Sequence, residues 1–169
     1  YYLKFKMFII ENTTNRYLNY TQVLKFSFGE RIQKISINAG FTCPNRDGSK
    51  GIGGCTYCNN QTFSPEYCTP TKSITQQIEE GILFFKKYES QVYLAYFQSH
   101  TNTYDALDKL TAIYEEALAH PKVVGIVVGT RPDCVNDELL DYFAALSKRC
   151  YVMIEYGIES TEDSTLEFI

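Results

Sequence analysis

The run VVGIVV, from Val123 to Val128, decides the fold class, because it is almost entirely apolar and has the length of one strand. A strand with one wet face alternates apolar and polar residues, whereas a parallel strand covered on both faces reads as a continuous apolar run. The run therefore predicts a buried strand in a parallel sheet.

The segments on either side of this run alternate between the helical and the strand period. Further strands are predicted at Gln33–Asn38, Gln91–Phe97 and Tyr151–Tyr156. Amphipathic helices are predicted at Tyr20–Phe28, Ser73–Tyr88, Asp105–Ala119, Asn136–Ser147 and Thr161–Phe168, with Ser73 and Asn136 as N-caps and Gly29 as a stop. A chain that alternates strand and helix in this way predicts an α/β fold with a parallel sheet.

We expect residues 1–32 to form an N-terminal arm followed by the short helix, and residues 33–169 to form a single core domain. Residues 1–14 mix apolar and polar side chains without a clear period, so this arm is either irregular or an edge strand.

The longest predicted loop, NAGFTCPNRDGSKGIGGCTYCNNQ from Asn38 to Gln61, carries three cysteines, Cys43, Cys55 and Cys58. Two residues separate the last pair, a spacing that lets both sulfurs turn toward one metal centre, and the glycines before Cys55 let the backbone fold back. If only these three cysteines bind, an iron-sulfur cube keeps one iron open to a small molecule. If Cys68 joins them, four thiolates could close a tetrahedral zinc site.

The composition is that of an ordinary globular domain, with 169 residues, 44% hydrophobic and 21% charged. Six irregularly spaced cysteines do not make a disulfide scaffold, and no secretory leader or membrane-length apolar run is present, so we expect a cytoplasmic protein without a membrane anchor. The net charge of -4 gives no general attraction to nucleic acid. Basic residues in the first third form either a solvated face or an RNA-binding patch; they are Lys25, Arg31, Lys34, Arg46 and Lys50.

The loops that follow the strands should form the functional site, because the carboxyl ends of parallel strands share one edge. Besides the cysteine loop, these are the polar segments 98–102, 129–133 and 157–160.

The cysteine loop with Tyr57, the TRPD segment from Thr130 and the IEYGIES segment from Ile154 together resemble the radical S-adenosylmethionine (SAM) superfamily. Within it, the chain is most similar to uncharacterised bacterial proteins of the YhcC type, and more distantly to the radical domain of the elongator catalytic subunit. The resemblance implies a (βα) TIM-like barrel, of which this chain would hold about four of six strands, so that the core domain would be truncated at its C-terminus.

The resemblance also implies a function and its cofactors. Cys43, Cys55 and Cys58 would hold a 4Fe-4S cluster whose fourth iron is chelated by S-adenosyl-L-methionine. Reductive cleavage would give a 5′-deoxyadenosyl radical that abstracts hydrogen from a substrate, with RNA as the substrate class and a one-electron reductase such as flavodoxin or ferredoxin as partner. The implied cofactor-binding residues are Tyr57, Gln98, Ser99, Thr130, Arg131, Glu159 and Ser160.

The chain departs from the superfamily pattern in three places, one of which is Gly129, where the elongator relatives have an acidic residue. Eleven residues separate its first two cysteines, where the common loop has three, and Glu159 stands where the elongator relatives have Gln. The alternative from a different class is a non-catalytic α/β module that binds RNA and is stabilised by zinc on Cys43, Cys55, Cys58 and Cys68.

Overall fold

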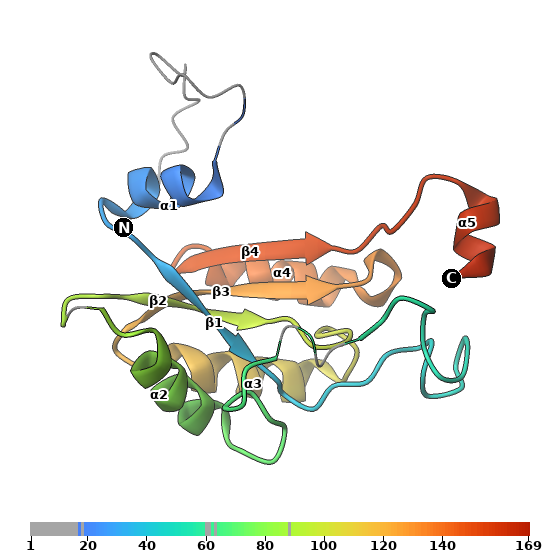
Figure 1. Ribbon diagram of the computed structural model, residues 1–169, viewed down its shortest axis with the longest axis horizontal. Helices are drawn as coiled ribbons and strands as arrows, with labels where there is room; N and C mark the ends of the chain where they lie inside the picture. Colours follow the sequence, from blue (N-terminus) through green and yellow to red (C-terminus); the bar gives the residue numbers. More distant parts are fainter. Residues whose placement is uncertain (1–16, 18, 60–61, 63, 88) are drawn as a thin grey trace.

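The centre of the molecule is an open sheet of four parallel strands in the order β1-β2-β3-β4 (Figure 1). The computed structural model describes residues 17, 19–59, 62, 64–87 and 89–169, so the arm expected over 1–14 lies outside the described residues. The strands are β1 (Gln33–Ile37), β2 (Tyr93–Phe97), β3 (Val123–Thr130) and β4 (Tyr151–Tyr156). This confirms the predicted α/β class, and the unclosed sheet is that of a partial (βα) barrel.

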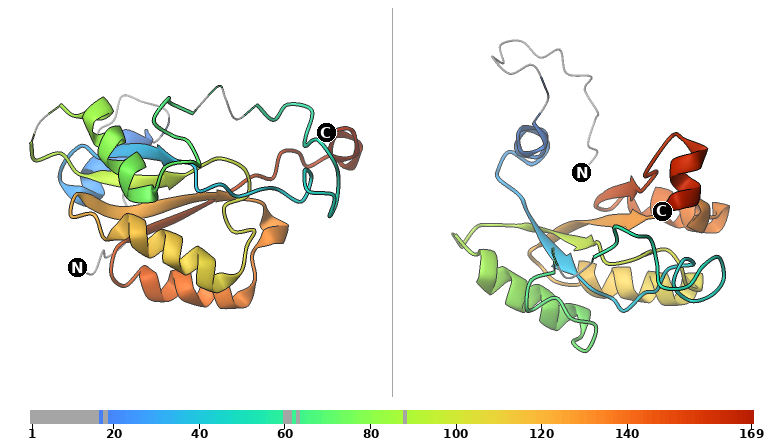
Figure 2. Two further views of the ribbon diagram at one scale, coloured as in Figure 1. Left: turned by 90° about the horizontal axis from the view of Figure 1, so that it is seen from below. Right: turned by 45° about the vertical axis from the view of Figure 1, so that its right-hand side comes forward.

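The helices lie on both sides of this sheet (Figure 2). Three of them cover one face: α2 (Ile74–Phe85), α3 (Leu107–Leu118) and α4 (Asp137–Leu146). The helix α1 (Tyr20–Phe28) lies on the opposite face, and α5 (Asp163–Phe168) follows β4. Within the described ranges, no helix is long and apolar enough to cross a membrane.

The helix boundaries follow the capping signals of the sequence. Ser73 accepts a hydrogen bond from the Gln76 amide at 3.1 Å, and Asn136 accepts one from the Leu139 amide at 2.9 Å, which confirms both predicted N-caps. Gly29 ends α1 with a φ of 75°, as predicted. The helix α2 ends at Phe85, earlier than predicted, because the backbone of the next residue is extended.

The core has two parts, one on each face of the sheet. The larger lies under α2, α3 and α4 and includes Ile35, Phe97, Ile126, Tyr114 and Phe143. The smaller lies under α1, where Leu24 and Ile32 pack with Leu94 and Val127. The apolar run of β3 thus contributes side chains to the core on both faces of the sheet. For this reason its sequence does not alternate between apolar and polar residues.

A bulge near the start of β3 changes which side chains face α1. Tyr93 pairs with Val123, but the next residue, Leu94, pairs with Gly125, so β3 advances two residues where β2 advances one. After the bulge, Ile126 and Val128 face the helix-covered core and Val127 faces the α1 side. Because the alternation is shifted by one residue, each later residue of β3 faces the side opposite to the one expected without the bulge.

One buried side chain, Gln77 of α2, holds both ends of the loop that carries the cysteines. Its amide oxygen accepts from the Asn38 backbone N–H at 2.9 Å, and its Nε2 donates to the Asn38 carbonyl at 3.0 Å. The same Nε2 donates to the Lys72 carbonyl at 3.2 Å. Gln77 is fully buried, so its side-chain amide must find its partners within the protein, and these backbone groups supply them.

We therefore expect Gln77→Met to lower the free energy of unfolding by about 2–3 kcal/mol, because it removes three hydrogen bonds to the backbone of Asn38 and Lys72. Urea denaturation measures the loss. Gln76→Met, on the exposed side of the same helix, is the matched control and should change stability by less than about 0.5 kcal/mol. Equal effects of the two substitutions would contradict the anchoring role.

Candidate functional site at the carboxyl edge of the sheet

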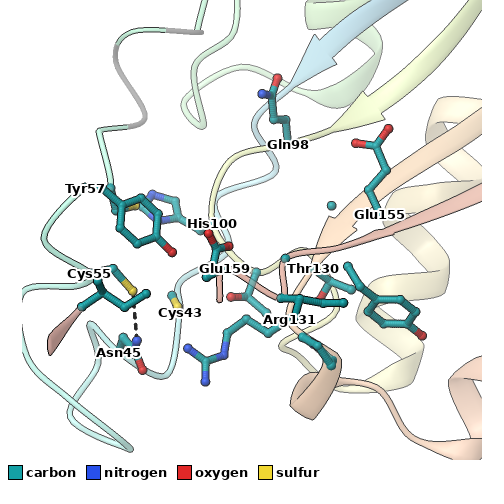
Figure 3. Close-up of a pocket in the computed structure, with 18 of the residues that line it drawn as sticks. Cys43, Asn45, Cys55, Tyr57, Gln98, His100, Thr130, Arg131, Glu155 and Glu159 are labelled. Carbon is teal, nitrogen blue, oxygen red and sulfur yellow. Dashed lines mark hydrogen bonds between the residues drawn. The ribbon is translucent and has the colours of Figure 1, made fainter. Parts of the chain in front are cut away.

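The loops that follow the four strands enclose one cavity of about 850 Å³. The sequence predicted that these loops would form one site, and residues of all four line the cavity. The lining includes Cys43, Asn45, Cys55, Tyr57, Cys58, Tyr96, Gln98, His100, Thr130, Arg131, Asp133, Glu155, Glu159 and Ser160 (Figure 3).

Hydrogen bonds between the loops make this edge a continuous structure. Asn102 donates to the Gly129 carbonyl from its backbone at 3.2 Å and from its side chain at 2.8 Å, which joins the loop after β2 to the end of β3. The Thr101 N–H donates to the Thr42 carbonyl at 3.2 Å, which joins the same loop to the cysteine loop. The Gly157 N–H donates to the Thr130 carbonyl at 2.9 Å, which joins β4 to β3.

The eleven residues between Cys43 and Cys55 fold back on themselves. The Pro44 carbonyl accepts from the Lys50 N–H at 2.9 Å, and the Asn45 carbonyl accepts from the Gly54 N–H at 2.8 Å. Cys55 consequently returns beside Asn45, whose Nδ2 donates to the Cys55 sulfur at 3.1 Å (Figure 3). The long spacing therefore still brings all three cysteines of this loop to the same cavity.

The three cysteines are partly exposed and free, as metal ligands in a cavity wall must be. Among the residues that the structure describes, no group of three or more His, Cys, Asp or Glu side chains converges closely enough to hold a metal ion. A single zinc ion needs all of its sulfur ligands within about 2.3 Å. The thiolate ligands of a 4Fe-4S cube bind separate irons, so they do not converge on one point.

The remaining cysteines lie elsewhere. Cys68 is 4% exposed and belongs to the core cluster under α2, where burial raises the pKa of its thiol to about 11. It does not line the cavity with Cys43, Cys55 and Cys58. Burial, and next Asp133, raise the pKa of Cys134 to about 11, and burial also raises that of Cys150. These shifts favour inert thiols.

Arg131 is held in place by a carboxylate two residues further along the chain. Its Nε and Nη2 donate to the two oxygens of Asp133, each at 2.9 Å, and Lys50 of the cysteine loop pairs with the same carboxylate. The hydrogen bond from Arg131 lowers the pKa of Asp133 well below its ordinary range. A guanidinium has five N–H donors, so Arg131 keeps three for a ligand.

Tyr57 and Glu159 lie together beside the cysteines (Figure 3). Burial raises the pKa of the Tyr57 phenol, and so does its hydrogen bonding to Glu159 and Cys55. Glu159 adopts a left-handed backbone with a φ of 64°, which is uncommon for a non-glycine residue and typical of functional turns. His100, in the loop after β2, also has a left-handed backbone, with a φ of 65°.

Of the other predicted cofactor-binding residues, three line the cavity and one does not. Gln98 lines the far end of the cavity, and Ser160 lines it near Glu159. Thr130 also borders it, but its hydroxyl is hydrogen-bonded to buried Thr103. Ser99 is 2% exposed and does not line the cavity, so its side chain is not positioned to contact a ligand there.

Sequence reasoning missed a polar group made of Lys34, Tyr96 and Glu155, of which Tyr96 and Glu155 line the cavity floor. Lys34 pairs with Glu155 at 2.7 Å and lies 4.1 Å from the centre of the Tyr96 ring, and the Tyr96 hydroxyl donates to Glu155 at 2.7 Å. Burial, followed by this hydrogen bond, raises the pKa of Tyr96, so its hydroxyl stays protonated. The signal was available, because a charged residue is unusual inside a parallel strand.

The chain is similar to several curated proteins. It is 38% identical to protein YhcC of Escherichia coli strain K12 over 143 residues, which are 84% of this chain and 45% of that protein. It is 35% identical over 159 residues to YtqA of Bacillus subtilis strain 168, with 94% and 49% covered. It is 32% identical over 156 residues to MJ0486 of Methanocaldococcus jannaschii, with 90% and 47% covered.

YtqA and MJ0486 are described as uncharacterised, so their similarity to this chain does not indicate an activity. No family model and no solved structure matches the chain. The chain spans about half the length of the curated relatives that it matches.

Proposed function

We propose that the protein is a radical SAM enzyme that uses the cavity at the carboxyl edge of its sheet. The observation that carries this proposal is the fold of the cysteine loop, which brings Cys43, Cys55 and Cys58, and no fourth cysteine, to the wall of one cavity. Three ligands are what a 4Fe-4S cluster needs when one of its irons must stay open to a small molecule.

The protein's own groups fit such a cluster. Cys43, Cys55 and Cys58 would hold it, and the amide of Asn45 already donates to one of the sulfurs. When bound, the cluster would supply the electron that cleaves S-adenosyl-L-methionine into methionine and a 5′-deoxyadenosyl radical, which abstracts hydrogen from the substrate. The surrounding loops would orient both molecules and keep competing hydrogen donors out.

The cofactor's polar groups find partners around the same cavity. Arg131, pinned by Asp133, presents its remaining N–H donors as a fork for the methionine carboxylate. Glu159 supplies a carboxylate that accepts hydrogen bonds from ribose hydroxyls. Tyr57, Gln98, Ser160 and Thr130, which line the cavity, complete the proposed contacts, whereas the buried side chain of Ser99 does not line it.

The reaction also requires a one-electron donor, and we assign this part to a flavodoxin-like or ferredoxin-like reductase. RNA is the substrate class that the sequence resemblance suggests. With a volume of about 850 Å³, the cavity lies at the upper end of the range for small-molecule sites, as a site shared by cofactor and substrate requires.

The deciding experiment is anaerobic reconstitution with iron and sulfide, followed by reduction and addition of S-adenosyl-L-methionine. We expect brown protein with roughly four irons per chain. Chromatography of the reaction should then show 5′-deoxyadenosine and methionine. Colourless protein that carries one zinc per chain would overturn the proposal and favour the RNA-binding module.

The number of cysteine ligands is tested by substitution. We expect Cys58→Ala to bring bound iron after reconstitution to less than about one quarter of the wild-type level, because a cube left with two thiolates is poorly held. Cys68→Ala is the control and should keep nearly full iron, since Cys68 lies in the core. Equal loss of iron in both variants would indicate a site with four cysteines.

The role of Arg131 is tested by calorimetry with S-adenosyl-L-methionine on the reconstituted protein. Arg131→Lys should weaken binding about tenfold, because an ammonium cannot replace a planar fork that binds two oxygens. Arg149→Lys changes the same residue type at the start of β4, away from the cavity, and should leave the affinity unchanged. Equal affinities for the two variants would remove Arg131 from the cofactor site.

A further inference from the structure

The segment between Cys43 and Cys55 places two nitrogen-bearing side chains, Asn45 and Arg46, against the cysteines. Resting on the proposed function, we infer that these two residues raise the reduction potential of the cluster that Cys43, Cys55 and Cys58 hold. Neither residue has a thiolate or carboxylate with which to ligate iron, so each acts through the ligands and is a positioning residue.

Asn45 acts through a directed hydrogen bond. Its Nδ2 lies 3.1 Å from the Cys55 sulfur, and its backbone carbonyl accepts from the Gly54 N–H at 2.8 Å. The two contacts fix Asn45 at the backbone and at the side chain to adjacent residues of the same turn. A donor held this way withdraws electron density from a ligand sulfur, and hydrogen bonds to sulfur are among the factors that set cluster potentials.

Arg46 adds a positive charge beside Cys58. Its Nη2 donates to the Cys58 carbonyl at 3.3 Å. A Cβ on Gly54, which has a φ of +91°, would lie only 2.7 Å from the Arg46 Nε, so the absence of a side chain there is what lets the guanidinium approach.

Reduction adds one negative charge to the cluster. An amide donor and a guanidinium both stabilise the reduced state more than the oxidised one, because their interaction with the sulfurs grows with the negative charge. The two residues therefore make the cluster easier to reduce. The eleven-residue spacing is, on this inference, the means by which the loop brings these groups to its own sulfurs.

The test measures the potential of the reconstituted cluster and does not depend on turnover. Wild type, Asn45→Leu, Asn45→Asp and Arg46→Gln are titrated with dithionite and mediators, and the reduced cluster is followed by electron paramagnetic resonance. At a fixed solution potential near the wild-type midpoint, we expect the ratio of reduced to oxidised cluster to fall about threefold to tenfold in Asn45→Leu and Arg46→Gln. The ratio should fall further in Asn45→Asp, because this substitution replaces a hydrogen-bond donor with a negative charge.

Arg149→Gln is the matched control for charge. It removes one guanidinium that pairs with Glu115, at the start of β4 and outside the cavity, and should leave the ratio at the wild-type value. A purely structural role for Asn45 and Arg46 would change the amount of cluster bound without changing the potential of the clusters that remain.

The outcomes separate this inference from the function on which it rests. A wild-type protein that binds no cluster overturns both. A wild-type cluster whose potential is unchanged in Asn45→Leu, Asn45→Asp and Arg46→Gln overturns the inference alone. If no Asn45 variant retains a cluster, Asn45 is needed for binding and not for tuning, which also overturns the inference.

Discussion

The buried amide of Gln77 is the interaction on which the site depends. It bonds the backbone of Asn38 and of Lys72, the two ends of the segment that contains the cysteines. Closing a long loop costs conformational entropy that grows slowly with length, so a few bonds at its base are enough to define where it starts and ends. Because Gln77 belongs to α2, which packs on β1, the base of the cysteine loop is fixed to the sheet itself.

Above this base, hydrogen bonds between the loops hold them in position, although the loops contain little regular secondary structure. Asn102 of the loop after β2 bonds the end of β3 twice, and its own carbonyl accepts from the buried Tyr114 hydroxyl of α3. The position of the β2 loop is thereby set by a core residue. Functional loops on a rigid scaffold are common, but here the loops are also fixed to one another, which keeps the groups around the cavity in a constant arrangement.

Much of the fold could be predicted from the sequence, because the apolar run of β3 and the caps Ser73 and Asn136 are local signals. The face of the sheet on which each β3 side chain lies could not be predicted, because it depends on the bulge between Val123 and Gly125. Without the bulge, simple alternation would turn Thr130 toward the cavity and Arg131 away from it. With it, the Thr130 hydroxyl bonds Thr103, and Arg131 lines the cavity.

The same strand geometry accounts for the position of the cavity at the carboxyl edge. On the face opposite the three large helices, α1 fills the lower part of the sheet with apolar contacts to Leu94 and Val127. Nearer the carboxyl edge, Glu155 is the register partner of Gly129, and both residues line the cavity. Lys34 reaches up from β1 to neutralise Glu155, and Tyr96 donates to it, so the floor of the cavity is polar without carrying net charge. A floor of this kind can hydrogen-bond a neutral or charged molecule, while Arg131 on the same lining keeps the N–H donors that Asp133 does not use.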